Sequence, residues 1–73
     1  MTFVDSSAFI AQLDQDEANH RDAKRLWNVL LDSNEELLST NYVVVETYAV
    51  LQRKLGMDGV VAFSTNLLPL VEL

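Results

Sequence analysis

The sequence contains no cysteine and no long apolar run. Without cysteine the chain can form neither a disulfide scaffold nor a thiolate metal site, and this fits a reducing compartment such as the cytoplasm. No apolar run approaches the ~18 residues that a membrane helix needs, and the charge of Asp5 comes too early for a signal peptide. There are no repeats, low-complexity segments or internal domain boundaries, so one folding unit is expected over residues 1–73 and no membrane contact.

Basic residues are also scarce. Five lysines and arginines stand against eleven acidic residues, which gives a net charge of −6 that repels nucleic acid at long range. Hydrophobic residues make up 49% of the chain, which is typical of a globular protein. A chain near this length buries only about 60% of its unfolded surface, so we expect it to need a partner surface, either a second copy or another segment.

The pattern along the chain predicts alternating strands and helices. The expected elements are strands at 2–4, 37–40 and 70–73 and helices at 8–13, 17–31, 41–55 and 58–67. This β-α-α-β-α-α-β order predicts an α/β fold with a three-stranded parallel sheet flanked by helices. The segment 43–45 is a run of valines that favours a strand. We predict a helix there, capped by Asn41, because Val44, Tyr48 and Leu51 recur with helical spacing and Gly56 stands where a glycine cap belongs.

Asp5 stands between the first strand and the first helix. In open α/β sheets, binding sites lie at the carboxyl ends of the strands. An aspartate at this position is therefore well placed for a metal or phosphate site. The alternative is that Asp5 only caps the helix or ends the strand.

Glu46 is the second candidate. Val43 and Val50 share its face of the predicted helix, so an apolar setting is expected for this carboxylate. The alternative is a snorkelling or salt-bridged glutamate. Because Asp5 and Glu46 follow successive parallel strands, we expect both at one edge of the sheet, within reach of one hydrated ion. Mg²⁺ and Mn²⁺ prefer such oxygen ligands and promote phosphodiester cleavage.

Two segments carry a family resemblance. The segment 3–10, with Asp5 followed by two serines and a helix, resembles the opening of PIN domains. The segment 37–48, a strand that leads into a helix bearing Glu46, is similar to the second motif of that family. The helix between them, with His20, Ala23 and Leu26, also matches the usual pattern. The resemblance covers the whole chain and implies the N-terminal half of a PIN-like domain over residues 1–73.

The resemblance implies a metal-dependent endoribonuclease similar to the VapC-type toxins of toxin–antitoxin pairs. It implies that Asp5 and Glu46 are catalytic residues and ligands of Mg²⁺ or Mn²⁺, with Ser7 as an outer-shell neighbour. RNA is then the substrate, an antitoxin the protein partner and the cytoplasm the location. Further aspartates complete the family site in the C-terminal half, so we expect this chain to be inactive alone. The alternative is a non-catalytic fragment that binds an antitoxin or self-associates.

Other readings of the candidate residues are weaker. A haloacid-dehalogenase-type phosphatase also begins with a strand-end aspartate, but it needs a second aspartate where Ser7 stands. His20 favours a surface or capping role over metal binding, because metal sites need convergent partners. Trp27, Tyr42 and Tyr48 follow the apolar stripes, which favours the core or a partner surface over base stacking.

Self-association is expected through first strands or exposed helices. Helix packing is slightly favoured, because strand pairing would bring two copies of Asp5 together.

Overall fold

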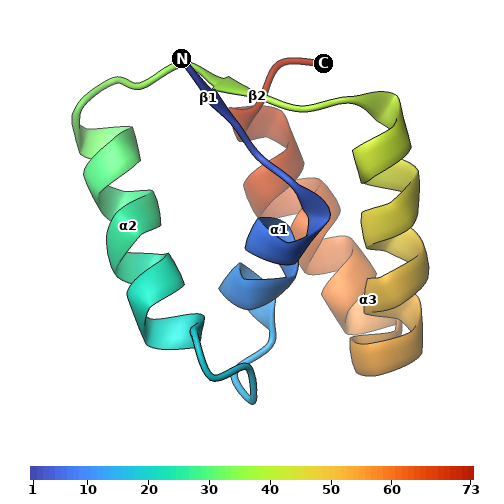
Figure 1. Cartoon of the computed structure of the whole chain (residues 1–73). Helices are drawn as coiled ribbons and strands as arrows, with labels where there is room; N and C mark the ends of the chain where they lie inside the picture. Colours follow the sequence, from blue (N-terminus) through green and yellow to red (C-terminus); the bar gives the residue numbers. More distant parts are fainter.

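Two short parallel strands lie along one side of the molecule, and the helices pack beneath them (Figure 1). The computed structural model describes residues 1–73. β1 (Thr2–Phe3) pairs with β2 (Leu37–Leu38), with Thr2 opposite Leu37. The parallel pairing predicted from the alternation of strands and helices is confirmed.

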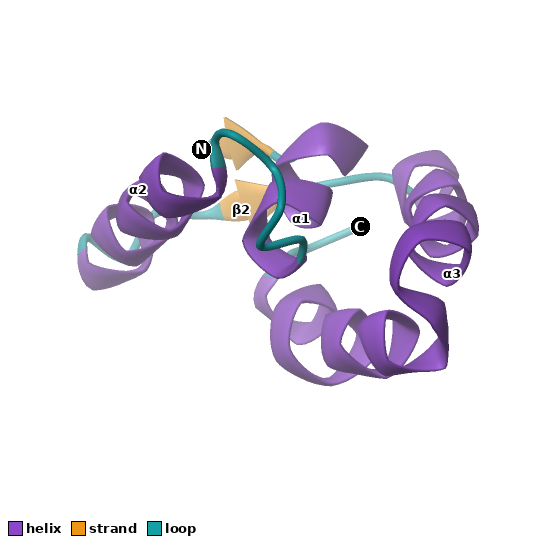
Figure 2. Cartoon of the chain, turned by 90° about the horizontal axis from the view of Figure 1, so that it is seen from below, coloured by secondary structure: helices purple, strands orange, loops and turns teal.

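Three helices and two short helical turns make up the rest of the chain. They are α1 (Ser6–Leu13), α2 (His20–Asp32), α3 (Asn41–Ala62), the π-helical turn η1 (Phe63–Leu67) and the 3₁₀ turn η2 (Leu68–Leu70). α1 lies between α2 and α3 and packs against both (Figure 2). The element order therefore agrees with an α/β fold in which helices follow each strand.

The predicted third strand is not formed. η2 occupies residues 68–70, where Pro69 stands in the first helical positions. The following segment makes one parallel bridge, in which Glu72 N donates to Leu37 O and Ser39 N donates to Glu72 O, both at 2.8 Å. The three-stranded sheet is therefore not confirmed, although this segment lies beside β2 as expected. β1 is left with one free edge.

The loop before α2 delays the start of that helix to His20 instead of residue 17. Asp14 accounts for the difference. Its carboxylate accepts a hydrogen bond from Asp16 N at 3.0 Å, and its carbonyl accepts one from Glu17 N at 3.1 Å. These bonds hold the segment in turns, so Asp14 organises the loop between α1 and α2.

α3 confirms the helical reading of the valine run but not its cap. Thr40 is the N-cap, and its Oγ1 accepts a hydrogen bond from Val43 N at 3.1 Å, whereas Asn41 is the first helical residue. Gly56 interrupts the helix with φ 72° and ψ −160°, a conformation that is essentially restricted to glycine. The expected boundary between two helical segments therefore lies at Gly56, and the second segment continues into η1.

The core is organised around four aromatic rings from different elements. The ring of Phe9 lies 6.3 Å from Trp27 and 5.0 Å from Phe63, and Phe63 lies 5.2 Å from Tyr48, all in edge-to-face arrangements. The apolar stripe expected on α2 is only partly buried. Trp27 is buried, but the Leu26 side chain is 59% exposed because no element covers that side of α2.

Candidate functional site

The site is built where the two strands end. Val4 N donates to Leu38 O at 2.7 Å, and the buried hydroxyl of Ser39 donates to Val4 O at 2.9 Å. These bonds join the end of β1 to the end of β2 immediately before each chain segment turns into a helix. Ser39 was not identified from the sequence, because only the paired strands reveal that its hydroxyl faces a carbonyl.

Asp5 occupies the N-cap position of α1 with an extended backbone (φ −91°, ψ 168°). Its carbonyl accepts hydrogen bonds from Ala8 N at 3.1 Å and Phe9 N at 3.3 Å. Its side chain is exposed and makes no capping hydrogen bond. The alternative that Asp5 serves only as a helix cap is therefore not supported, and its carboxylate is free to bind a ligand.

Glu46 lies in the second turn of α3 and is exposed. The expected apolar enclosure is wrong. Val43 is buried and Val50 is half-buried, but both turn toward the core while Glu46 lies at the margin of that face. The salt-bridge alternative is not supported either, because no ion pair includes Glu46. Its carboxylate is also free.

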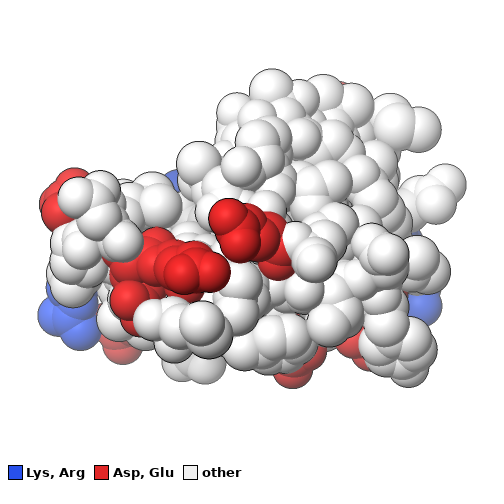
Figure 3. Space-filling model, turned by 90° about the horizontal axis from the view of Figure 1, so that it is seen from above, with Lys and Arg blue, Asp and Glu red and all other residues white.

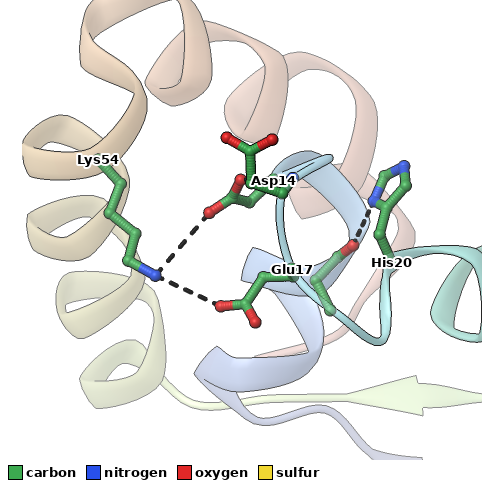
Figure 4. A network of polar contacts seen from close by, with 6 residues as sticks. Asp14, Glu17, His20 and Lys54 are labelled. Atoms are coloured by element: carbon green, nitrogen blue, oxygen red, sulfur yellow. Dashed lines mark hydrogen bonds and ion pairs between the residues drawn. The ribbon is translucent and has the colours of Figure 1, made fainter.

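An ion-pair network links α3 to the end of α1 and the loop that follows it (Figure 4). Lys54 Nζ lies 3.3 Å from Glu17 Oε1 and 3.8 Å from Asp14 Oδ2, just beyond the end of α1. Lys54 is eight residues after Glu46 and about 12 Å along the helix from it. Asp5 is nine residues before Asp14, about 13 Å in helical rise.

These matched spacings place the two candidate acids at the same end of the helix pair. α1 and α3 pack against each other, and both lead away from neighbouring strand ends (Figure 1). Because Lys54 meets Asp14 at the far end, Asp5 and Glu46 both lie on the parts of this helix pair nearer the sheet. Each acid thus follows one of the two paired strands, and their joint reach to one ion stays a prediction.

The acids do not form a larger metal cluster. No group of three or more histidine, cysteine, aspartate or glutamate side chains converges anywhere in the chain. Figure 3 shows acidic side chains gathered on the face seen from above, with lysine and arginine only at its rim. An ion held by two carboxylates keeps most of its water ligands, which is a common arrangement for Mg²⁺.

Two other polar groups lie outside the site. Glu35 stands before β2, at the amino end of the sheet, and hydrogen bonding from Thr2 Oγ1 at 2.6 Å, with help from the N-terminus at 3.0 Å, lowers the pKa of its carboxyl. His20 Nδ1 lies 2.7 Å from Ala11 O. This contact joins α2 to α1 through a half-buried ring, whereas a surface or capping role was expected for His20.

The family model described as PIN domain matches residues 2–73. The chain is similar to the crystal structure of VapC20 from Mycobacterium tuberculosis, a Sarcin-Ricin loop cleaving toxin, with a TM-score of 0.76 and 29% sequence identity. The match covers 99% of this chain and 54% of that one, so the chain spans about half the length of VapC20.

No curated protein matches the chain. None of its helices is long and apolar enough to cross a membrane.

Proposed function

Because the chain belongs to the PIN domain family, we propose that Asp5 and Glu46 are metal-binding, catalytic acids of a ribonuclease site of the VapC toxin type. The main support for this proposal is that two free, exposed carboxylates follow the ends of neighbouring parallel strands. The similarity to a toxin that cleaves the Sarcin-Ricin loop supports RNA as the substrate and the cytoplasm as the place of action.

The donor set fits Mg²⁺ or Mn²⁺. Both carboxylates are hard oxygen ligands, and Mg²⁺ is often bound by only one or two carboxylates with water completing its octahedron. When bound, the ion supplies Lewis-acid catalysis for phosphodiester hydrolysis. Asp5 and Glu46 bind and orient it, and the hydrogen bond from Ser39 to Val4 O keeps the two strand ends in register. Ser7 is exposed on the first turn of α1 and is available for an outer-shell contact.

The 73-residue chain by itself is proposed to cleave RNA at a negligible rate. Two carboxylates hold a divalent ion weakly, and the net charge of −6 repels the phosphate backbone. Full activity requires further carboxylates, which the family domain carries in its C-terminal half. Metal-dependent cleavage by the purified chain that Asp5→Asn abolishes would contradict this, whereas cleavage that survives Asp5→Asn indicates a contaminating nuclease.

Mn²⁺ binding tests the proposed site directly. We expect Asp5→Asn and Glu46→Gln each to weaken Mn²⁺ affinity at least about tenfold, because each removes one of two anionic ligands. Asp58→Asn is the matched control, since Asp58 is exposed, makes no ion pair and follows the break at Gly56. Electron paramagnetic resonance of free Mn²⁺ gives the affinities. Equal affinities in all four proteins would reject the shared metal site.

A second function is favoured by the apolar surface. The side chains of Phe3 and Leu26 are 57% and 59% exposed and border one groove between β1, α1 and α2. A non-catalytic module that binds an antitoxin or a second copy would use such a surface. This alternative gains support if Mn²⁺ binding is insensitive to both acid substitutions while the chain still associates with a protein partner.

A further inference from the structure

Tyr42 is the most exposed aromatic residue in the chain. Its side chain is 78% exposed, whereas Phe9, Phe63 and Trp27 are buried in the core. The phenol group makes no hydrogen bond with the protein, in contrast to Tyr48, whose hydroxyl lies 2.7 Å from Ser64 Oγ. Of the two places expected for Tyr42, the core is wrong and a partner surface stays a prediction, and the ring contributes little to packing.

The position of Tyr42 links it to the candidate acids. It lies in the first turn of α3, just after the end of β2, and precedes Glu46 by four residues. Side chains at this spacing are neighbours on a helix, with Cβ atoms about 6 Å apart. The exposed ring thus stands one helical turn from the Glu46 carboxylate, at the same edge of the sheet.

We propose that Tyr42 is a stacking platform for a nucleobase of the RNA substrate. This inference rests on the proposed function, in which a phosphate of the RNA lies at an ion held by Asp5 and Glu46. The base of a nucleotide bound there lies within reach of a ring one helical turn away. Stacking on an aromatic face tolerates any base, so Tyr42 positions the strand without reading its sequence.

Stacking also answers an electrostatic difficulty of this surface. The net charge is −6. Lys54 is engaged by Asp14 and Glu17, whereas Arg53, seven residues after Glu46, is exposed and makes no ion pair. Ionic contacts from α3 to phosphates are therefore limited to Arg53, and a further favourable contact to RNA requires a group whose attraction is not ionic. A π face meets this requirement, because base–aromatic stacking needs no positive charge.

The competing occupant is an apolar surface of a protein. Val45 is 67% exposed and lies three residues from Tyr42, on the adjoining part of the same helix face. A protein laid across α3 would contact both side chains, whereas a stacked base needs only the flat ring. Val45→Ala is therefore the matched control for Tyr42→Ala.

The experiment measures binding of a short oligoribonucleotide to the full 73-residue chain in Mg²⁺ by NMR titration, which detects weak complexes. A ribose-phosphate oligomer of equal length without bases is titrated in parallel. We expect the base-bearing oligomer to shift the Tyr42 ring protons upfield. Tyr42→Ala should weaken its binding about tenfold, while Tyr42→Phe and Val45→Ala keep the affinity within about twofold. Binding of the abasic oligomer should not depend on Tyr42.

Several outcomes overturn the proposal. Unchanged affinity in Tyr42→Ala, equal losses in Tyr42→Ala and Val45→Ala, equal binding of both oligomers, or no binding of either oligomer would each reject Tyr42 as a platform. Failure of the proposed metal site is seen separately, as Mn²⁺ affinity that is insensitive to Asp5→Asn and Glu46→Gln. Base-dependent binding through Tyr42 combined with that second result would support the platform and reject the metal site.

Discussion

At the residue scale, a single buried hydroxyl holds the two strand ends together. Ser39 is 6% exposed, and its Oγ donates to Val4 O at 2.9 Å, one residue before Asp5. Ser39→Ala leaves this carbonyl without its side-chain donor and should lower the free energy of unfolding by about 1–3 kcal/mol. Urea denaturation followed by circular dichroism measures the loss.

Ser33→Ala is the matched control. Ser33 Oγ also donates to a main-chain carbonyl, that of Leu30 at 3.1 Å, but this bond is exposed. Water can replace it, so a change within about 0.5 kcal/mol is expected. Equal losses in the two variants would show that burial of the Ser39 bond adds no stability.

Glu35 provides a pH-dependent contribution at the same scale. Hydrogen bonding from Thr2 and the N-terminus lowers the pKa of its carboxyl from 4.5. The unfolded chain therefore binds this proton more readily, and the stabilisation is present above pH 4.5 and is lost as the pH falls through the lowered folded-state pKa. Glu35→Gln should be less stable than the native chain at pH 7.

The difference between the two proteins is the quantity to measure, because other carboxylates titrate in both. The urea midpoint of the native chain should exceed that of Glu35→Gln at pH 7, and this difference in midpoint should be smaller at pH 3. A gap that is constant or grows toward acid would contradict the lowered pKa of Glu35.

At the element scale, the start of α3 decides where Glu46 and Tyr42 stand. Thr40 Oγ1 accepts from Val43 N, and Asn41 makes no corresponding bond. Thr40→Ala should lower the free energy of unfolding by about 1 kcal/mol, as other N-cap losses do. Asn41→Ala, one residue later and equally exposed to solvent, should have little effect. Thermal denaturation that reverses this order would restore Asn41 as the functional cap.

The same helix contains the valine run at 43–45, which residue propensities alone would assign to a strand. Val43 and Val44 are buried against the core, and this packing outweighs the preference of β-branched residues for strands. Thr47 is fully buried, and its hydroxyl donates to Val43 O at 2.7 Å. The periodic spacing of apolar residues was therefore a better guide to this element than the residue types themselves.

At the scale of the whole molecule, the uncovered side of β1 and α2 predicts self-association. β1 has a free edge, and Leu26 borders the apolar groove beside it. Such surfaces rarely stay bare in soluble monomers. We expect static light scattering at micromolar concentration to give a mass above that of one 8.2 kDa chain. A folded, strictly monomeric species would contradict this prediction.

A paired substitution locates the contact. Leu26→Ser should weaken association, because Leu26 is 59% exposed beside the groove. Val61→Ser is the control, since Val61 is similarly exposed at 55% but lies on the segment after Gly56. Association lost in the Val61 variant and kept in the Leu26 variant would move the interface to the other side of the molecule.

The sequence by itself determined the order of the first two strands and of the helices around them, the helix through the valine run, the break at Gly56 and the place of Asp5 after the first strand. These features follow from local spacing and backbone preference. Only the tertiary structure decided that Glu46 and Tyr42 are exposed, that Ser39 bonds to Val4 O, and that the third strand is reduced to one bridge. The physical reason is that exposure and pairing depend on which elements cover a face, and those elements come from distant parts of the sequence.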